Sequence, residues 1–324
     1  MERNGASRLS VDRMSLLTKI ARMYHEQGVR QPEIANRLHI SQSRVSRMLK
    51  EAVAVGVVRT IVVPPVGVHT ELEEQIRDLY ALADVVVTDA PPNDDAALLS
   101  ALGRAGAAYL ETTLTGSDRV GISSWSSTLL ATVNAMAPGT NRTAETVVQV
   151  LGGVGDPSAQ VQATRLTDRL ARVTGATAMY FPAPGIVANA TVRDALLGDG
   201  YIAELVEAWS LLTVVLVGIG SFEPSPLLKD SGNAISETEQ QSLSALGAVG
   251  DVCLRYFDES GELVSTDLHD RVLGISVNVL RAIPRKVGIA GGARKHEAIR
   301  GALRGRWVDV LITDVETARY LILR

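Results

Sequence analysis

The feature that most constrains the fold is the alternation, from Ala83 onward, of short β-branched runs with helical stretches. Near-continuous apolar strands separated by helices are typical of a parallel sheet covered by helices on both faces. The sequence therefore predicts an α/β body built on a parallel sheet. Its eight predicted strands are Val85–Thr88, Arg119–Ile122, Val147–Val150, Ala178–Phe181, Thr213–Val217, Val252–Phe257, Lys286–Ile289 and Asp309–Thr313.

The composition is that of an ordinary globular protein, with 46% hydrophobic and 21% charged residues among 324, a length typical of two domains. The one cysteine, Cys253, excludes an intrachain disulfide and a thiolate-rich zinc site. The most apolar run, Leu211–Gly220, is only about half as long as a bilayer crossing. The start of the chain, Met1–Met14, lacks the apolar stretch of a signal peptide. We therefore expect a cytoplasmic protein that does not enter a membrane.

Small and hydroxyl residues follow five of the predicted strands. Ligands of parallel α/β sheets bind at the carboxyl ends of the strands, and open N–H groups at a helix start can hold a phosphate. Lys295 can add a cation one turn into its helix, so the pattern suggests a small phosphorylated ligand. Gly-Gly after a strand also occurs in plain tight turns. The five segments are Ser123–Thr128, Leu151–Gly153, Pro182–Gly185, Gly218–Gly220 and Ala290–Lys295.

Three further positions carry polar groups that a ligand could use. Asp251 precedes a predicted strand and is either a ligand for hydroxyl groups or a plain turn residue. The pair Asp270–Arg271 is read more readily as a structural ion pair than as a binding group. His296 is expected to be an exposed helix residue rather than a catalytic base. No nucleophile elbow, Walker A loop or HExxH motif occurs, so neither a metal nor another cofactor is predicted.

Charge is divided unevenly along the chain. Residues 1–60 carry 11 Lys and Arg against 5 Asp and Glu, a net +6, and the other 264 residues carry 21 against 31, a net −10. A small basic module on a large acidic body is typical of a polyanion-binding domain fused to another unit. A solvated basic surface would give the same numbers.

The basic segment has the helical pattern of a helix-turn-helix domain. Apolar residues at helical spacing predict a helix over Ser15–Gln27, which Gly28 ends. A second helix is predicted over Gln31–Leu38, and Ser41 is a good N-cap for a third over Gln42–Val55. The run Gly56–Val63 is β-branched, as in the wing or exit strand of a winged domain.

The third helix has the arrangement that a recognition helix needs. Val45, Met48, Leu49 and Ala52 form its inner face and leave short polar and basic residues outside. Such residues fit the major groove and bond base edges, although arginines there can equally hold phosphates. A small three-helix bundle that binds protein is the alternative. The residues predicted to contact DNA are Gln31, Ser41, Gln42, Ser43, Arg44, Ser46, Arg47 and Lys50.

A predicted linker helix connects the two parts. Pro64–Pro65 breaks the chain, and Thr70 is expected to cap a helix through Leu82 in a capping box with Glu73. Its apolar stripe of Leu72, Ile76 and Leu79 either packs on the body or meets its copy in another subunit. The predicted domains are 1–63 for DNA binding, 64–82 for the linker helix and 83–324 for the effector.

These blocks together resemble the SorC/DeoR-type bacterial transcriptional regulators, over nearly the whole chain from about Leu16 to Leu323. The order and spacing of many short blocks carry the resemblance, since no block is specific alone. The blocks are Leu16–Gly28, Glu33–Lys50, Trp125–Thr128, Gln149–Gly153, Phe181–Pro184, Val217–Gly220, Gly250–Cys253, Gly291–Lys295 and Leu311–Asp314.

The resemblance implies a body related to ribose-phosphate isomerase and glucosamine-phosphate deaminase, a homodimer or homotetramer, and a phosphorylated sugar or polyol as effector. By the family pattern the phosphate lies at the loop Trp125–Thr128 and at Gly291, Gly292 and Lys295. Asp251 then meets the sugar hydroxyls. The implied effector-binding residues are Ser124, Trp125, Ser126, Ser127, Thr128, Gln149, Gly152, Pro182, Gly218, Gly220, Asp251, Gly291, Gly292 and Lys295.

The sequence departs from the family pattern at three positions. Ser126 stands where members usually have Gly, and its Cβ narrows the approach of a phosphate to the backbone. Val315 stands where Glu usually follows Asp314. Arg30 stands where a Thr usually caps the second helix of the head, a difference of about 1 kcal/mol.

The resulting prediction is a DNA-binding regulator of a carbohydrate or polyol catabolic operon, controlled by a sugar effector and not an enzyme. The first alternative is a sugar-phosphate isomerase or deaminase with an accessory nucleic-acid-binding head, for which Asp251 and Asp270 would have to supply acid and base. The second is a protein-docking adaptor.

Overall fold

The structure, a computed structural model, describes residues 11–59, 65, 67–123, 125–139, 141–153, 157–221 and 235–323. The chain divides into two compact units, Met1–Pro64 and Pro65–Arg324, which we call the head and the body. Three sequence predictions lie wholly or partly outside the described residues: the binding residue Ser124, the domain boundary at 63–64, and the end of the strand 56–63. Within that run, residues 56–59 form turns and no strand.

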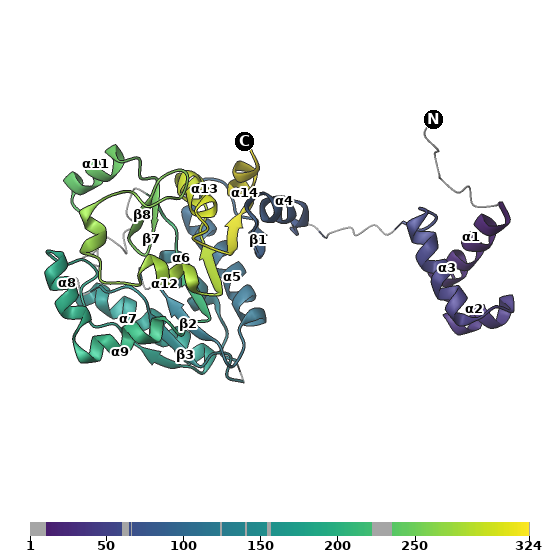
Figure 1. Cartoon of the computed structure of the whole chain (residues 1–324), viewed down its shortest axis with the longest axis horizontal. Coiled ribbons are helices and arrows are strands. Elements are labelled where there is room, and N and C mark those ends of the chain that lie inside the picture. Colours follow the sequence, from purple (N-terminus) through teal and green to yellow (C-terminus); the bar gives the residue numbers. More distant parts are fainter. Residues whose placement is uncertain are drawn as a thin grey trace, which may run out of the picture. The chain divides into compact units, whose positions relative to one another are not determined.

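Residues 11–59 of the head form three helices around one small core (Figure 1). The helices are α1 (Val11–His25), α2 (Gln31–Leu38) and α3 (Gln42–Ala54). Leu17, Ile20, Ile34 and Val45 are fully buried between them. The helical spacing of apolar residues therefore predicted the head correctly, because each helix supplies one apolar face to a shared core.

The ends of the head helices follow the predicted signals. Gly28 has a φ of +68°, the left-handed conformation that ends α1. Arg30 precedes α2 without a side-chain cap. Ser41 Oγ accepts a hydrogen bond from the Arg44 N–H at 3.3 Å and so caps α3. The cap fixes the start of the helix on which the predicted DNA contacts lie.

The body is built on a seven-stranded, fully parallel sheet, as the sequence predicted. The strand order is β1-β10-β9-β5-β2-β3-β4. The strands are β1 (Asp84–Thr88), β2 (Arg119–Ile122), β3 (Thr146–Gln149), β4 (Thr177–Met179), β5 (Val214–Val217), β9 (Arg285–Ile289) and β10 (Val310–Asp314).

Both faces of the sheet are covered by helices. In β5, Val215 and Val217 belong to one buried cluster, whereas Val214 and Leu216 belong to the other. Because successive strand residues point to opposite faces, this explains why the strands are apolar at every position. The second cluster includes α5 (Asp95–Thr113), α6 (Ser127–Ala135) and α7 (Pro157–Thr174), and the first includes α9 (Gly200–Trp209), α12 (Val277–Ala282), α13 (His296–Arg304) and α14 (Val315–Ile322).

The predicted single strand Val252–Phe257 is wrong. The chain there forms a hairpin of β7 (Gly250–Val252) and β8 (Arg255–Phe257), and β7 pairs with the short β6 (Gly220–Ser221). Cys253 and Leu254 turn the corner with φ angles of +52° and +61°. Two-residue turns of this kind need two positive φ angles and usually contain Asn or Gly, so this sequence gave no signal of a turn.

Helix α4 (Thr70–Tyr80), the predicted linker helix, packs on the body. Ile76 is fully buried there and Leu72 partly, whereas Leu79 is 49% exposed. The predicted capping box is wrong, because the N-cap residue is His69, without a side-chain cap. The Glu73 carboxylate instead accepts a hydrogen bond from the Val87 N–H of β1.

A contact between His69 and Asp89 fastens the start of α4 to the end of β1. His69 Nε2 lies 2.8 Å from Asp89 Oδ1. Together with the bond from Glu73, it holds α4 against the edge strand of the sheet. The point at which the chain enters the body is therefore fixed to β1 by polar contacts as well as by packing.

The remaining described elements complete the cover of the body. None of the helices in the described ranges is long and apolar enough to cross a bilayer. The elements not yet named are α8 (Ala190–Leu197), α11 (Glu237–Ala245), and the 3-10 turns η1 (Asp267–Asp270) and η2 (Ala293–Lys295).

Candidate functional site

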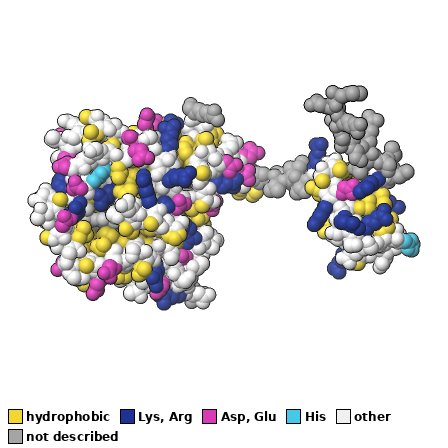
Figure 2. Space-filling view, in the orientation of Figure 1, with side chains coloured by type: hydrophobic (Ala, Val, Ile, Leu, Met, Phe, Trp, Pro, Cys, Tyr) yellow, Lys and Arg dark blue, Asp and Glu magenta, His cyan; other side chains and the backbone are white. Residues whose placement is uncertain are grey.

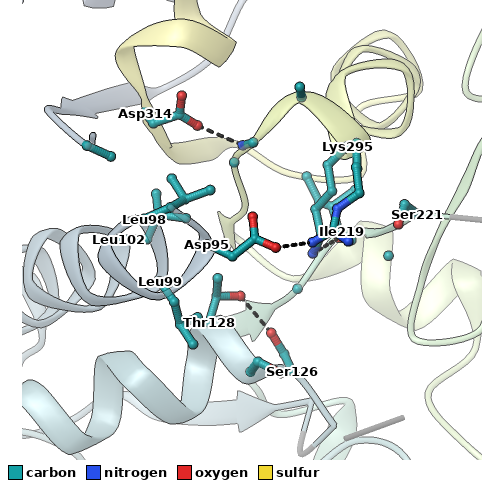
Figure 3. A pocket seen from close by; sticks show the side chains of 18 of the residues that line it. Asp95, Leu98, Leu99, Leu102, Ser126, Thr128, Ile219, Ser221, Lys295 and Asp314 are labelled. Atoms are coloured by element: carbon teal, nitrogen blue, oxygen red, sulfur yellow. Dashed lines mark hydrogen bonds and ion pairs between the residues drawn. The ribbon is translucent and has the colours of Figure 1, made fainter. Parts of the chain in front are cut away.

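A cavity of about 480 Å³ lies at the carboxyl edge of the parallel sheet (Figure 3). Its walls come from the segments that follow β1, β2, β3, β5, β9 and β10 and from the β7–β8 hairpin. This is the edge at which parallel α/β sheets bind ligands, and the volume is in the range of small-molecule sites.

The cavity brings together ten of the fourteen predicted effector-binding residues. Gln149, Gly152 and Pro182 do not line it, and Ser124 lies outside the described residues. The ten are Trp125, Ser126, Ser127, Thr128, Gly218, Gly220, Asp251, Gly291, Gly292 and Lys295.

Trp125 supports the cavity wall from behind. Its side chain is 4% exposed, and its Nε1–H donates to the Gly152 carbonyl oxygen at 3.0 Å. A Cβ on Gly153 would lie 2.0 Å from the indole ring. Gly153 therefore makes room for Trp125, whereas a Cβ on Gly152, which is not in the lining, would lie 2.4 Å from the Pro184 carbonyl oxygen.

Gln149 joins two loops beneath the cavity. Its Nε2 donates to the Leu151 carbonyl oxygen at 2.8 Å, and its Oε1 accepts from the Phe181 N–H at 3.2 Å. Both ends of the amide are thus bonded to the backbone. The structure thus gives Gln149 a structural role beside the cavity, and Pro182 is exposed outside its lining.

The hydroxyl of Ser126 both donates and accepts a hydrogen bond at the start of α6. Thr128 Oγ1 donates to the Ile289 carbonyl oxygen at 3.0 Å, so the contact of 2.8 Å between Ser126 Oγ and Thr128 Oγ1 uses the Ser126 proton. Ser126 Oγ also accepts from the Leu129 N–H at 3.3 Å. Ser126 therefore caps the helix N-terminus that faces the cavity.

Asp251 is the most perturbed carboxylate in the lining. It is 7% exposed, and its Oδ2 accepts from the Leu254 N–H at 2.9 Å. A Cβ on Gly220 would lie 1.9 Å from Oδ1, so Gly220 permits the close approach of this side chain. Burial raises the pKa of Asp251 to about 6, against the Leu254 N–H and the Lys295 ammonium, which lower it.

Lys295 lies close enough to Asp251 for the two charges to interact. Its Nζ donates to the Ile219 carbonyl oxygen at 2.8 Å, and burial lowers the pKa of the ammonium group while Asp251 raises it. The expectation that Lys295 lies one turn into a helix is wrong, because α13 begins only at His296. Its place at the end of η2 directs the side chain toward β5 rather than along a helix.

The Gly291–Gly292 loop is closed by the start of α14. The Gly292 N–H donates to Asp314 Oδ2 at 2.8 Å and to Thr317 Oγ1 at 3.0 Å. A Cβ on Gly291 would lie 2.3 Å from Asp314 Oδ2. The glycines thus allow the Asp314 carboxylate to contact the loop backbone.

One wall of the cavity, at the start of α5, was missed by the sequence analysis. Leu98, Leu99 and Leu102 line this wall opposite Lys295, and Asp95 forms an ion pair of 2.5 Å with Arg294 (Figure 3). These residues lie after the carboxyl end of β1, just as the predicted binding segments lie after the ends of their strands. Examination of the segment after Val85–Thr88 by the same rule would have found them.

Comparison with known proteins identifies the family of this chain. A family model named Sugar-bind, for a sugar-binding domain, matches residues 65–323. The deoxyribonucleoside regulator of Bacillus subtilis (strain 168) is 31% identical over 311 residues, which cover 96% of this chain and 98% of that protein. The chain belongs to the SorC/DeoR-type transcriptional regulators.

Solved structures of this family support the same assignment. The full-length sorbitol operon regulator SorC of Klebsiella pneumoniae has a TM-score of 0.71 and 30% identity, covering 95% of this chain and 98% of that chain. The sugar-binding domain of the transcriptional regulator DeoR from Pseudomonas syringae pv. tomato has a TM-score of 0.63 and 39% identity, covering 79% and 99%.

Membership of the SorC/DeoR family favours a regulator over the enzyme alternative. The similar proteins are named as regulators. Asp270, the second carboxylate that the enzyme would need, does not line the cavity and lies 3.5 Å from Arg193. Arg271 pairs with Glu239 instead, so the predicted ion pair of Asp270 with Arg271 is wrong although both make ion pairs.

His296, which the sequence analysis weighed as a catalytic base, packs against α14. His296 is half-buried and stacks on Tyr320 at 4.2 Å, so the expectation of an exposed side chain is wrong. Within the described residues, no three His, Cys, Asp or Glu side chains are placed to hold a metal ion.

The head of this SorC/DeoR regulator presents cations at the start of α3. Arg44, Arg47 and Lys50 are exposed and form no ion pair with a described residue, whereas Arg22 pairs with Glu26 and Arg37 with Glu33. Figure 2 shows Lys and Arg side chains on the visible face of the head. Two other residues predicted to contact DNA, Gln42 and Ser43, are also exposed. Gln31 and Ser46 are half-buried.

Proposed function

We propose that this regulator binds operator DNA through α3 of its head and a small carbohydrate effector in the cavity of its body. The observation that carries the proposal is the cavity, which gathers Asp251, Lys295 and the hydroxyl-rich loop before α6 on the same chain as a helix-turn-helix head. Carboxylates and hydroxyls are the groups that bind sugar hydroxyls. The proposal includes no metal and no other cofactor.

The regulated genes are proposed to serve carbohydrate or polyol catabolism. Relatives of similar length are named as a deoxyribonucleoside regulator and a sorbitol operon regulator. The protein is proposed to act as a homodimer or homotetramer, because two heads on one face of the duplex read half-sites at multiples of about 34 Å. Leu79, exposed on α4, is available for a contact between subunits.

Fluorescence anisotropy on DNA from upstream of the gene tests the proposal. We expect tight binding that falls steeply with salt, is selective over random DNA, and is altered by one compound in a panel of sugars and polyols. Binding no tighter than that to random sequences, at every upstream region tried, would contradict DNA recognition by the head.

Replacement of Lys295 by alanine is expected to abolish the response to the effector and to leave operator affinity unchanged. The variant removes the cation that lies close to Asp251 in the cavity but changes no residue of the head. Anisotropy titrations with and without effector measure both properties. Arg319→Ala, which removes an exposed cation of α14 outside the cavity, is the matched control. An unchanged dose–response curve for Lys295→Ala would exclude Lys295 from the effector site.

A further inference from the structure

We propose that the contact between His69 and Asp89, which we call the latch, transmits the state of the cavity to the segment that leads to the head. The inference rests on the proposed function, because it assigns the route by which an effector changes DNA binding. Both residues lie outside the cavity lining and outside the head. They are therefore positioning residues, which join a wall of the cavity to the first helix of the body.

One wall of the cavity continues directly from Asp89. Asp95, the first residue of α5, pairs with Arg294 of η2, so this wall is joined to the segment that carries Lys295 (Figure 3). A compound that fills the cavity must contact or displace the chain that begins one residue after Asp89. Five residues of this wall belong to the lining: Ala90, Pro91, Asn93, Asp94 and Asp95.

The other partner of the latch, His69, is the N-cap residue of α4. His69 Nε2 donates to Asp89 Oδ1 at 2.8 Å. The chain approaches this contact at Gly67, whose φ is +86° and where a Cβ would lie 3.3 Å from Asp89 Oδ2. Asp89 therefore lies against the incoming chain at two positions, just before α4 begins.

The latch is the most exposed of the attachments described for α4. Ile76 is fully buried and Tyr80 Oη donates to the Leu321 carbonyl oxygen at 2.9 Å, so the end of the helix is held by packing as well as by a bond. The Asp89 side chain, in contrast, is 65% exposed. Exposed polar pairs change an equilibrium by no more than about fivefold, whereas effectors change the affinity of a second site by about 5–150-fold. The latch is therefore weak enough for an effector to make or break.

An effector acts on the latch only if it binds one of its two states more tightly. Asp89 and Ala90 are consecutive, so a shift of the wall moves the carboxylate relative to His69. Opening of the latch releases the start of α4 and leaves its end anchored at Ile76. The segment that leads to the head then loses a fixed point, and operator binding by two heads at a set spacing changes.

Asp89→Ala in the full-length protein tests the proposal. The measured quantity is the factor by which a compound changes the affinity for upstream DNA, from anisotropy titrations with and without that compound. The probes are ribose, glucose and sorbitol, and ribose 5-phosphate, glucose 6-phosphate and sorbitol 6-phosphate. For the compound that acts most strongly on the parent, this factor is expected to fall about three- to fivefold, the share that an exposed contact can carry.

Asp78→Ala is the matched control. It removes an exposed carboxylate of α4 that pairs with the adjacent Arg77, so the variant is expected to keep the parental factor. Equal losses in Asp78→Ala and Asp89→Ala would overturn the role given to the latch.

Calorimetric titration with the same compound, without DNA, separates a positioning role from a binding role. Asp89→Ala is expected to change the affinity for the compound by no more than about fivefold, because the side chain lies outside the lining. A greater loss would place Asp89 in the binding site. An unchanged response of the DNA affinity would show that the contact carries no signal. Either result would overturn the proposal.

His69→Phe removes the same contact from its other partner. If one contact carries the effect, the double variant with Asp89→Ala should lose no more of the response than either single variant. Losses that add in the double variant would show two separate roles and would contradict a shared latch.

The two proposals fail in different ways. If no compound of the panel alters operator binding by the parent, the proposed function fails and the latch fails with it. If the parent responds and the Asp89→Ala and His69→Phe variants respond equally well, the latch alone fails.

Discussion

Replacing Arg44 or Arg47 by alanine is expected to weaken operator binding by about 1–3 kcal/mol each, roughly five- to 150-fold. Both side chains are exposed near the start of α3 and make no ion pair with a described residue. They are therefore free to bond base edges or phosphates without first breaking a contact in the protein.

Anisotropy over a range of salt concentrations separates the two kinds of contact. An arginine that reads a base should lose discrimination at one operator position, whereas one that binds phosphate should weaken all sequences and lower the salt slope by about 1. Arg22→Ala, which removes an arginine of α1 already paired with Glu26, is the control. Parental affinity in both Arg44 and Arg47 variants would show that α3 is not the recognition helix.

Asp251→Asn is expected to stabilise the body by about 2–3 kcal/mol at pH 8 and to change its stability little near pH 4. Burial raises the pKa of Asp251 to about 6 in the folded protein, above the ordinary value of 3.8. The folded state thus holds the proton more tightly than the unfolded chain. The protonated carboxyl of Asp251 therefore contributes fully to stability below about pH 4, and this contribution is lost as the pH rises through about 6. Asparagine does not ionise, so the variant avoids this loss.

Urea unfolding followed by tryptophan fluorescence measures the effect. The three tryptophans, Trp125, Trp209 and Trp307, are all in the body, so the signal reports this unit alone. Asp118→Asn is a control of opposite sign. Burial alone would raise the pKa of Asp118, but hydrogen bonds from Thr115 and Thr213 and the nearby Arg285 hold this pKa below its ordinary value. A gain for Asp251→Asn that is equal at pH 4 and pH 8 would disprove the linkage.

The sheet and the head could be predicted because their signals are local. In β5, Val214 to Val217 face both sides of the sheet and are all buried, so the strand is apolar throughout. In α3, Ser41 caps the helix and the apolar face repeats at helical spacing. Each signal depends on residues that are close in sequence and on well-known preferences of the backbone.

The parts that could not be predicted depend on contacts distant in sequence. Cys253 and Leu254 adopt positive φ angles without being Gly or Asn, because the Leu254 N–H is held by Asp251. Leu98 reads as a core residue of an amphipathic helix until the fold places it in the cavity wall. Gln149 looks like a binding residue, and only the position of Phe181 shows that its amide is used by the backbone.

A hybrid regulator made by exchanging heads should be joined ahead of His69. The contact of His69 with Asp89 ties the start of α4 to the residue next to Ala90, which lines the cavity. A junction between His69 and Asp89 would break this contact, because the start of α4 and the cavity lining would then come from different proteins. We therefore expect residues 69–90 to act as one unit with the body, so that an exchange of heads ahead of His69 transfers the DNA specificity and keeps the proposed response to the effector.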